Sequence, residues 1–120
     1  MANVAQFGRV IGGHATATAG TTQTIAGATV LTGATNHVTT GNASDGVCLP
    51  LGGSVGDFVT VLNLSANALK VYPPKLADNA TGAGGAINGG SADAAFTHAA
   101  SKSGTYRCTG SNNWIATISA

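Results

Sequence analysis

Hydrophobic and polar residues alternate over short runs in this chain, most clearly across residues 57–64. The two sides of that run are Phe58, Thr60, Leu62 and Leu64, and Val59, Val61 and Asn63. A period of two predicts a β-strand, and apolar residues on both sides favour a strand that is covered on both faces. One face is expected to line a core, and the other to meet a second sheet or another subunit.

Similar short runs recur every 8 to 12 residues or so, a spacing typical of a β-sandwich or barrel. They predict strands at residues 36–40, 46–49, 69–72, 95–98, 104–109 and 114–118. Residues 65–68 and 110–113 are rich in turn-forming side chains, so each is predicted to close a hairpin. The chain contains no Glu and no apolar residues at helical spacing, so we expect an all-β, antiparallel fold.

The first 27 residues differ from the rest. Residues 15–22 are almost entirely Ala, Thr and Gly, with little apolar surface to bury. Such a segment forms either an edge strand or an extended arm that becomes ordered on a partner. The arm is favoured because so little burial offsets the entropy of ordering. The sequence thus predicts an arm or edge segment at residues 1–27 and a sandwich domain at residues 28–120.

The chain carries few charges. Only 8% of its 120 residues are charged, against roughly 25% in a typical domain, and the net charge is +1. A surface with few charges is poorly protected against association, which favours an assembly subunit. The five cations are scattered and form no basic stripe, so no nucleic-acid partner is predicted. No apolar run approaches the roughly 20 residues of a membrane span, and no secretory signal is visible.

Synthesis in a reducing cytosol would leave Cys48 and Cys108 as buried free thiols. Residues 52–56 match the G-x-S-x-G pattern, but a nucleophilic Ser54 needs an α/β-hydrolase sheet, so a turn is the better interpretation. The three histidines, His14, His37 and His98, are too far apart to suggest a metal site. We therefore predict no catalytic residue, no metal, no cofactor and no enzymatic activity.

Several segments from residue 56 onward resemble a recurring module of phage virions. They are Gly-Asp-Phe-Val-Thr-Val-Leu-Asn (56–63), Ala-Asn-Ala-Leu-Lys-Val-Tyr-Pro (66–73), Ala-Ile-Asn-Gly (86–89), Tyr-Arg-Cys (106–108) and Asn-Trp-Ile (113–115). They resemble the head decoration, or cement, proteins of tailed phages. The resemblance implies a small jelly-roll-like β-sandwich that forms a homotrimer on the outer capsid surface, bound to the major capsid protein and made in the host bacterial cytoplasm.

Candidate contact residues follow from this interpretation. The subunit interface is assigned to Val59 and Val61, or their opposite face, and to Asn63, Tyr72 and Tyr106. Contact with the capsid is assigned to the arm residues Gln6, Phe7, Arg9 and Val10. Similar segments also occur in phage fibre and tail-associated proteins. The alternative is therefore a tail-fibre or spike domain that binds a receptor or glycan through exposed aromatic or Asn/Asp side chains in residues 75–90.

Overall fold

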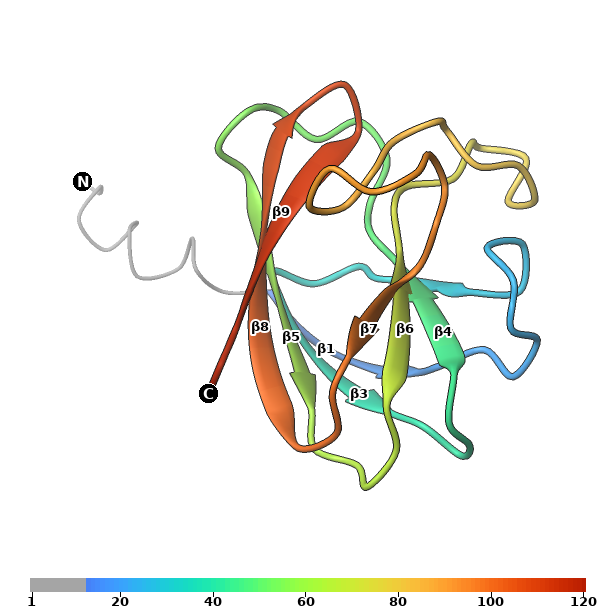
Figure 1. Cartoon of the computed structure of the whole chain (residues 1–120), viewed down its shortest axis with the longest axis vertical. Helices are drawn as coiled ribbons and strands as arrows, with labels where there is room; N and C mark the ends of the chain where they lie inside the picture. The colour runs from blue at the N-terminus through green and yellow to red at the C-terminus, as the bar shows by residue number, and fades with distance from the viewer. Residues whose placement is uncertain (1–12) are drawn as a thin grey trace.

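The computed structural model describes residues 13–120, which form two β-sheets around one main core (Figure 1). The strands are β1 (His14–Thr18), β2 (Thr29–Val30), β3 (Thr35–Thr39), β4 (Asp45–Cys48), β5 (Phe58–Asn63), β6 (Leu69–Tyr72), β7 (Phe96–His98), β8 (Lys102–Gly110) and β9 (Asn113–Ile118). One sheet has the order β1-β3-β5-β8-β9 and the other β2-β4-β6-β7. The all-β prediction is confirmed. Within the described range no helix could span a membrane.

The first six strands alternate between the two sheets. As a result β1, β3 and β5 are parallel neighbours in one sheet, and β2, β4 and β6 are parallel neighbours in the other. In the five-stranded sheet, residue 14 pairs with residue 35, which is 21 positions later in the chain, and residue 35 pairs with residue 60, which is 25 positions later. The chain thus coils between the sheets, and β7, β8 and β9 then add antiparallel strands.

The expectation of an antiparallel sandwich is wrong for four of the seven strand pairs, which are parallel. Parallel neighbours need a crossover connection, and here each crossover is a visit to the opposite sheet. A period of two identifies a strand without fixing its partner. The sheets are therefore mixed.

Of the two predicted hairpins, only one forms. Residues 110–113 join the antiparallel pair β8–β9, with left-handed backbone at Gly110, Ser111 and Asn112. Residues 65–68 instead lead from β5 in one sheet to β6 in the other. Asn63 fixes this crossing, because its side-chain amide donates to the carbonyl of Asn67 at 2.9 Å and its oxygen accepts from the hydroxyl of Ser65 at 2.8 Å.

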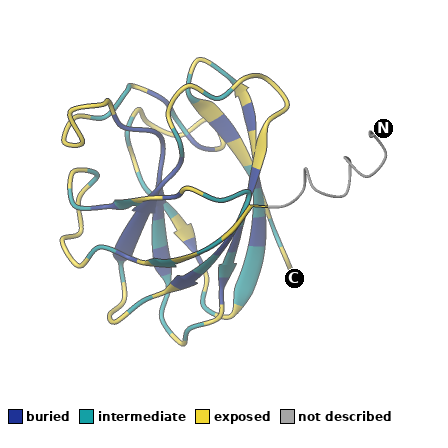
Figure 2. Ribbon diagram, turned by 180° about the vertical axis from the view of Figure 1, so that it is seen from behind, coloured by how far each residue is buried: buried dark blue, intermediate teal, exposed yellow. Residues whose placement is uncertain are grey.

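The main core lies between the sheets (Figure 2). Its buried members include Val38, Val47, Leu49, Val59, Val61, Leu69, Val71, Tyr106, Cys108 and Trp114. The four residues of β4 are all buried, and Cys48 joins Ala28 and Tyr72 in a second cluster on the other side of that sheet. Cys48 and Cys108 are buried free thiols, as the sequence predicted.

The start of the described chain belongs to the sheet. His14–Thr18 pairs with β3 as an edge strand, so the arm interpretation is wrong for those residues.

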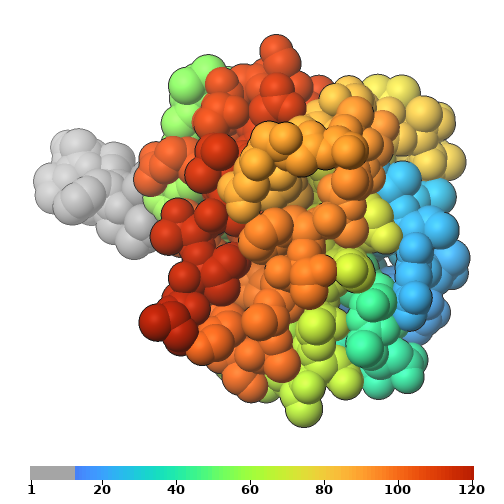
Figure 3. All heavy atoms as spheres, viewed as in Figure 1, coloured from blue at the N-terminus to red at the C-terminus, as the bar shows by residue number. Residues whose placement is uncertain are grey.

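Further along, Gly20 and Gly46 exchange two backbone hydrogen bonds of 2.9 Å. Residues 20–27, in blue, lie beside the yellow loop that begins at Lys75 (Figure 3). The ammonium of Lys75 joins the two by donating to the carbonyls of Ile25, Ala26 and Ala28.

Candidate functional site

The five-stranded sheet has one face against the core and one face that no other described element of the chain covers. We call the second the outer sheet face. It comprises His14, Thr16, Thr18, Thr35, His37, Thr39, Phe58, Thr60, Leu62, Ser103, Thr105, Arg107, Thr109, Ile115 and Thr117. Register places four threonines, Thr35, Thr60, Thr105 and Thr117, in one row across four strands. Apart from its histidines, this face carries one charged residue, Arg107.

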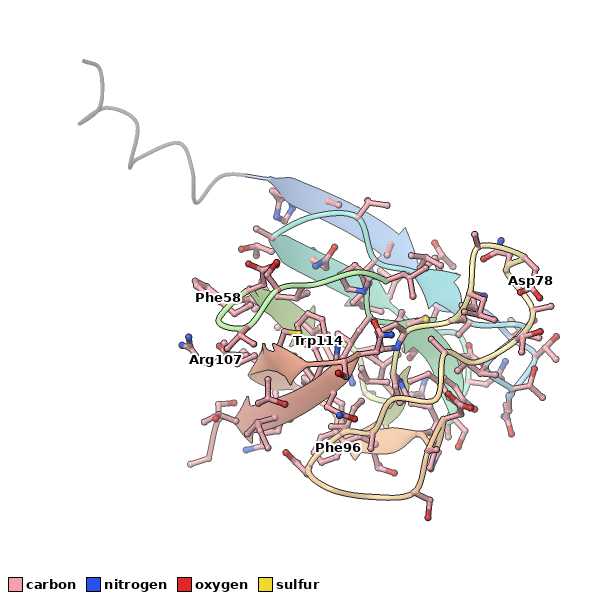
Figure 4. The ribbon with its side chains drawn as sticks, turned by 90° about the horizontal axis from the view of Figure 1, so that it is seen from above. Phe58, Asp78, Phe96, Arg107 and Trp114 are labelled. Atoms are coloured by element: carbon pink, nitrogen blue, oxygen red, sulfur yellow. The ribbon has the colours of Figure 1, made fainter. Side chains whose placement is uncertain are left out.

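Phe58 and Arg107 lie side by side on this face (Figure 4). The Arg107 guanidinium carbon is 5.3 Å from the centre of the Phe58 ring, a cation–π contact. Phe58 is nevertheless 52% exposed, and Ile115, paired with Arg107 on the next strand, is 46% exposed. Two half-exposed apolar side chains thus flank the Arg107 cation on this face.

The predicted interface residues lie on the other side of the strands. The side chains of Val59, Val61, Asn63, Tyr72 and Tyr106 are all buried within the chain itself. They have no surface to offer another subunit, so that assignment needs correction. The face opposite Val59 and Val61, named as the alternative, is the one left free.

The predicted capsid contacts, Gln6, Phe7, Arg9 and Val10, lie outside the described residues. The glycan alternative rested on residues 75–90, which contain no aromatic residue. In that loop the Asp78 carboxylate accepts bonds from the backbone of Ala80 and Thr81 and from the Thr81 hydroxyl. The two backbone bonds are the main reason that the pKa of Asp78 is lowered. The carboxylate therefore organises its own turn.

A cleft of about 710 Å³ opens at the end of the outer sheet face, between residues 50–57 and the start of β3. Its walls are Ala34, Thr35, Pro50, Leu51, Gly52, Gly53, Gly56, Asp57, Phe58, Val59 and Trp114. The volume falls within the roughly 300–1,000 Å³ of small-molecule sites. The predicted turn at residues 52–56 thus forms one wall of a cleft, and no sequence pattern had indicated it.

Ser54 and Asp57 fold the loop that forms this wall. The Ser54 backbone N–H donates to the Asp57 carboxylate at 2.8 Å, and the Asp57 N–H donates to the Ser54 carbonyl at 2.9 Å. Gly52 and Gly56 adopt left-handed backbone, with φ of 80° and 94°. The G-x-S-x-G match is therefore a turn, as its context in the sequence suggested.

Trp114 forms the inner wall of the cleft. Its backbone bonds to Ala86 and Asn88, both at 2.9 Å, and its side chain is only 1% exposed. A Cβ placed on Gly53 would lie 3.2 Å from Trp114 Cζ2, so the glycine lets the loop approach the indole edge. The indole Nε1 is buried and has no acceptor among the described residues. A buried indole N–H usually has a partner, so this donor stands out.

Three other groups with shifted pKa values, His98, Tyr106 and Cys48, are buried within the chain. Burial lowers the pKa of His98 and raises that of Tyr106, which lies 2.7 Å from it. Burial also raises the pKa of the Cys48 thiol to about 11. A thiol with that pKa stays protonated near neutral pH and is a poor nucleophile. Residues 13–120 contain no group of three or more His, Cys, Asp or Glu side chains placed to hold a metal ion.

Comparisons with known proteins add no relative to this picture. No family model matches the chain, and no curated protein matches it.

Proposed function

We propose that this chain is a structural virion protein that decorates the outer surface of a tailed-phage head as a homotrimer and stabilises the shell. In this proposal the chain performs no catalysis, and its partners are copies of itself and the major capsid protein. The finer features of the proposal are a jelly-roll-like arrangement of the two sheets and an N-terminal arm that contacts the shell.

The outer sheet face is the observation that carries the proposal. Leu62 and Thr60 lie near its centre on β5. Thr35 and Thr105 are the neighbours of Thr60 on the adjacent strands, and His37 and Ser103 are those of Leu62. Apart from its histidines, this face carries one charged residue, Arg107. It therefore favours contact with a partner surface that also carries few charges. A second copy of the same chain meets that condition. Burying Leu62 and Ile115 would contribute roughly 25 cal/mol for each Å² of apolar surface removed from water.

The edge strand β1 also favours assembly. It is the first strand in its sheet order, so one side of its backbone is unpaired within the described residues. Its side chains are His14, Ala15, Thr16, Ala17 and Thr18, with no Lys or Pro. Charged or proline-containing edges discourage pairing with other chains, and this edge lacks both. The N-terminal region, in which the arm is proposed, precedes this strand.

Copy number in purified virions tests the proposal. Quantitative mass spectrometry against the major capsid protein should find hundreds of copies for each particle if the chain decorates the head. A handful of copies would instead indicate a fibre or tail component and overturn the assignment to the head. Removing residues 1–12 tests the arm: the truncated protein should still associate with itself but no longer bind shells. Undiminished shell binding would contradict the arm.

A further inference from the structure

We propose that the cleft beside Trp114 is a binding site for a neutral saccharide. The site would be a separate property of the chain, since it is built within one copy and does not depend on the head-decoration role. Its volume of about 710 Å³ accommodates one or two pyranose rings.

The aromatic and apolar walls supply the stacking surface. Phe58 is half exposed and lines the cleft, and Pro50 and Leu51 lie on the facing loop. The C–H face of a pyranose is apolar and packs against such rings without a charge on the ligand. Arg107 contacts the Phe58 ring but is not among the residues that line the cleft. The Phe58 ring therefore offers contact area, with the Arg107 cation beside the ring and outside the cleft lining.

The polar groups of the cleft form a donor and acceptor set that hydroxyl groups match. Asp57 supplies a carboxylate, of which Oδ2 accepts from the Ser54 N–H. Thr35 supplies a hydroxyl. A sugar hydroxyl can donate to a carboxylate and exchange a hydrogen bond with another hydroxyl, so one ring can pair with both groups.

The same groups disfavour other ligand classes. The lining residues include one acid, Asp57, and no Lys, Arg or His, so a phosphate or carboxylate ligand would meet repulsion from Asp57 with no cation in the lining to pair with it. A purely apolar ligand would cover the Asp57 carboxylate without giving it a hydrogen-bond donor, and an unpaired buried polar group opposes binding. A neutral polyol ring avoids both costs.

The loop of residues 50–57 covers one edge of the Trp114 indole. Gly53 packs against the Trp114 edge, and the Gly52 N–H donates to the Asn112 side chain at 3.4 Å, a long bond. The Gly56 N–H donates to the Cys108 carbonyl at 2.9 Å and fixes the other end of the loop.

Trp114 allows a direct test because it is the only tryptophan in the chain. The indole gives one N–H cross-peak in a ¹H–¹⁵N spectrum, and that peak reports on the cleft alone. Full-length protein would be titrated with methyl α-D-glucopyranoside, methyl β-D-galactopyranoside and N-acetyl-D-glucosamine. At least one should shift the peak saturably, with a dissociation constant of about 1 mM, as expected for a ligand of few atoms. No saturable shift with any of the three would overturn the proposal.

Two variants separate the stacking and charge contributions. Phe58→Ala should weaken sugar binding about tenfold, which corresponds to ~1.4 kcal/mol. Leu76→Ala is the matched control, because Leu76 is 43% exposed but lies outside the cleft, and it should bind like the unaltered protein. Glucose 6-phosphate should bind more weakly than the neutral glucoside, and Asp57→Asn should reduce that difference. Equal loss in both alanine variants would contradict a site in the cleft.

One further ligand and one shortened chain test alternative occupants of the cleft. Cyclohexanol has a similar ring without vicinal hydroxyls and should not compete, so binding as tight as that of the sugars would show a merely apolar cavity. A chain that begins at Gly13 should bind sugars with unchanged affinity. If sugars bind only to that shortened chain, residues 1–12 occupy the cleft in the full protein, and the proposal fails. A monomeric protein that binds sugar would contradict the trimer proposal and leave this one intact.

Discussion

The phenol of Tyr106 donates a hydrogen bond to Nδ1 of His98, 2.7 Å away, in the core between the two sheets. The other ring nitrogen, Nε2, lies 2.9 Å from the Lys102 carbonyl, to which it can only donate. His98 thus uses both nitrogens with a single proton, as a neutral imidazole. The rings of His98 and Tyr106 are also stacked, at 23° between planes.

This arrangement predicts how stability depends on pH. Burial lowers the pKa of His98 in the folded chain below its ordinary 6.5. The unfolded chain therefore binds a proton first as the pH falls, and stability decreases from about pH 6.5 down to the folded pKa. Above that window the contribution is constant. Urea unfolding at about pH 8 and at about pH 5 should show a lower free energy of unfolding in acid.

His98→Gln provides the control for this effect. Glutamine can accept from Tyr106 and donate to Lys102 without titrating. Between about pH 8 and about pH 5, the free energy of unfolding should fall less in this variant than in the unaltered protein. The difference is the contribution of His98. An unchanged pH dependence would show that other groups cause it.

The strands were predictable because burial of one or both faces leaves a local pattern. Each of the runs predicted at β3 to β9 is a strand in the structure, within a few residues at its ends. The pairing of those strands was not predictable, because the partners are far apart in sequence. The side chains of Asn63 and Ser65 direct the chain to the opposite sheet, and nothing in residues 65–68 distinguishes that crossing from a hairpin.

For the candidate sites too, the local pattern was predictable and the contacts between distant segments were not. A period of two groups Val59 with Val61 and Phe58 with Leu62, but it does not say which pair faces inward. Asn63 lies on the inner face with Val59 and Val61, and its hydrogen bonds to Asn67 and Ala99 are visible only in the structure. The cleft was missed for a related reason. Its walls come from four separate segments of the chain, and no local pattern joins them.

Lys75 should contribute to stability through three carbonyl groups. Its ammonium is buried and donates to Ile25, Ala26 and Ala28, so Lys75→Met would leave those carbonyls without their donor. We expect a loss of about 2 kcal/mol in the free energy of unfolding, measured by urea titration. Lys70→Met is the matched control, because Lys70 donates only to the hydroxyl of Thr97, and it should lose under ~0.5 kcal/mol. Similar losses in the two variants would contradict the role of Lys75.

A substitution at Gly20 tests whether residues 19–28 are packed as part of the folded domain. A Cβ at this position would lie 1.9 Å from the Gly27 carbonyl oxygen, so Gly20→Ala should cost about 1–3 kcal/mol. In Gly41→Ala the nearest atom, Asp45 Oδ2, is 3.7 Å away, and thermal unfolding should change little. If both variants melt like the unaltered protein, residues 19–28 do not pack as described.

Leu62 tests the outer sheet face as the subunit contact. Its side chain points away from the core, so Leu62→Lys should leave the fold of a single chain intact while placing a desolvated charge in the proposed interface. Size-exclusion chromatography should show the variant as monomers with an unchanged far-ultraviolet circular dichroism spectrum. Leu76→Lys, a change away from this face, should remain trimeric. Trimers of the Leu62 variant would place the interface elsewhere.

The central claim is self-association, and the molar mass of the full-length chain in solution tests it most directly. Multi-angle light scattering at micromolar concentration should give three times the mass of one chain. A mass equal to one chain across that range would contradict the proposal that the outer sheet face is covered by further copies of the protein.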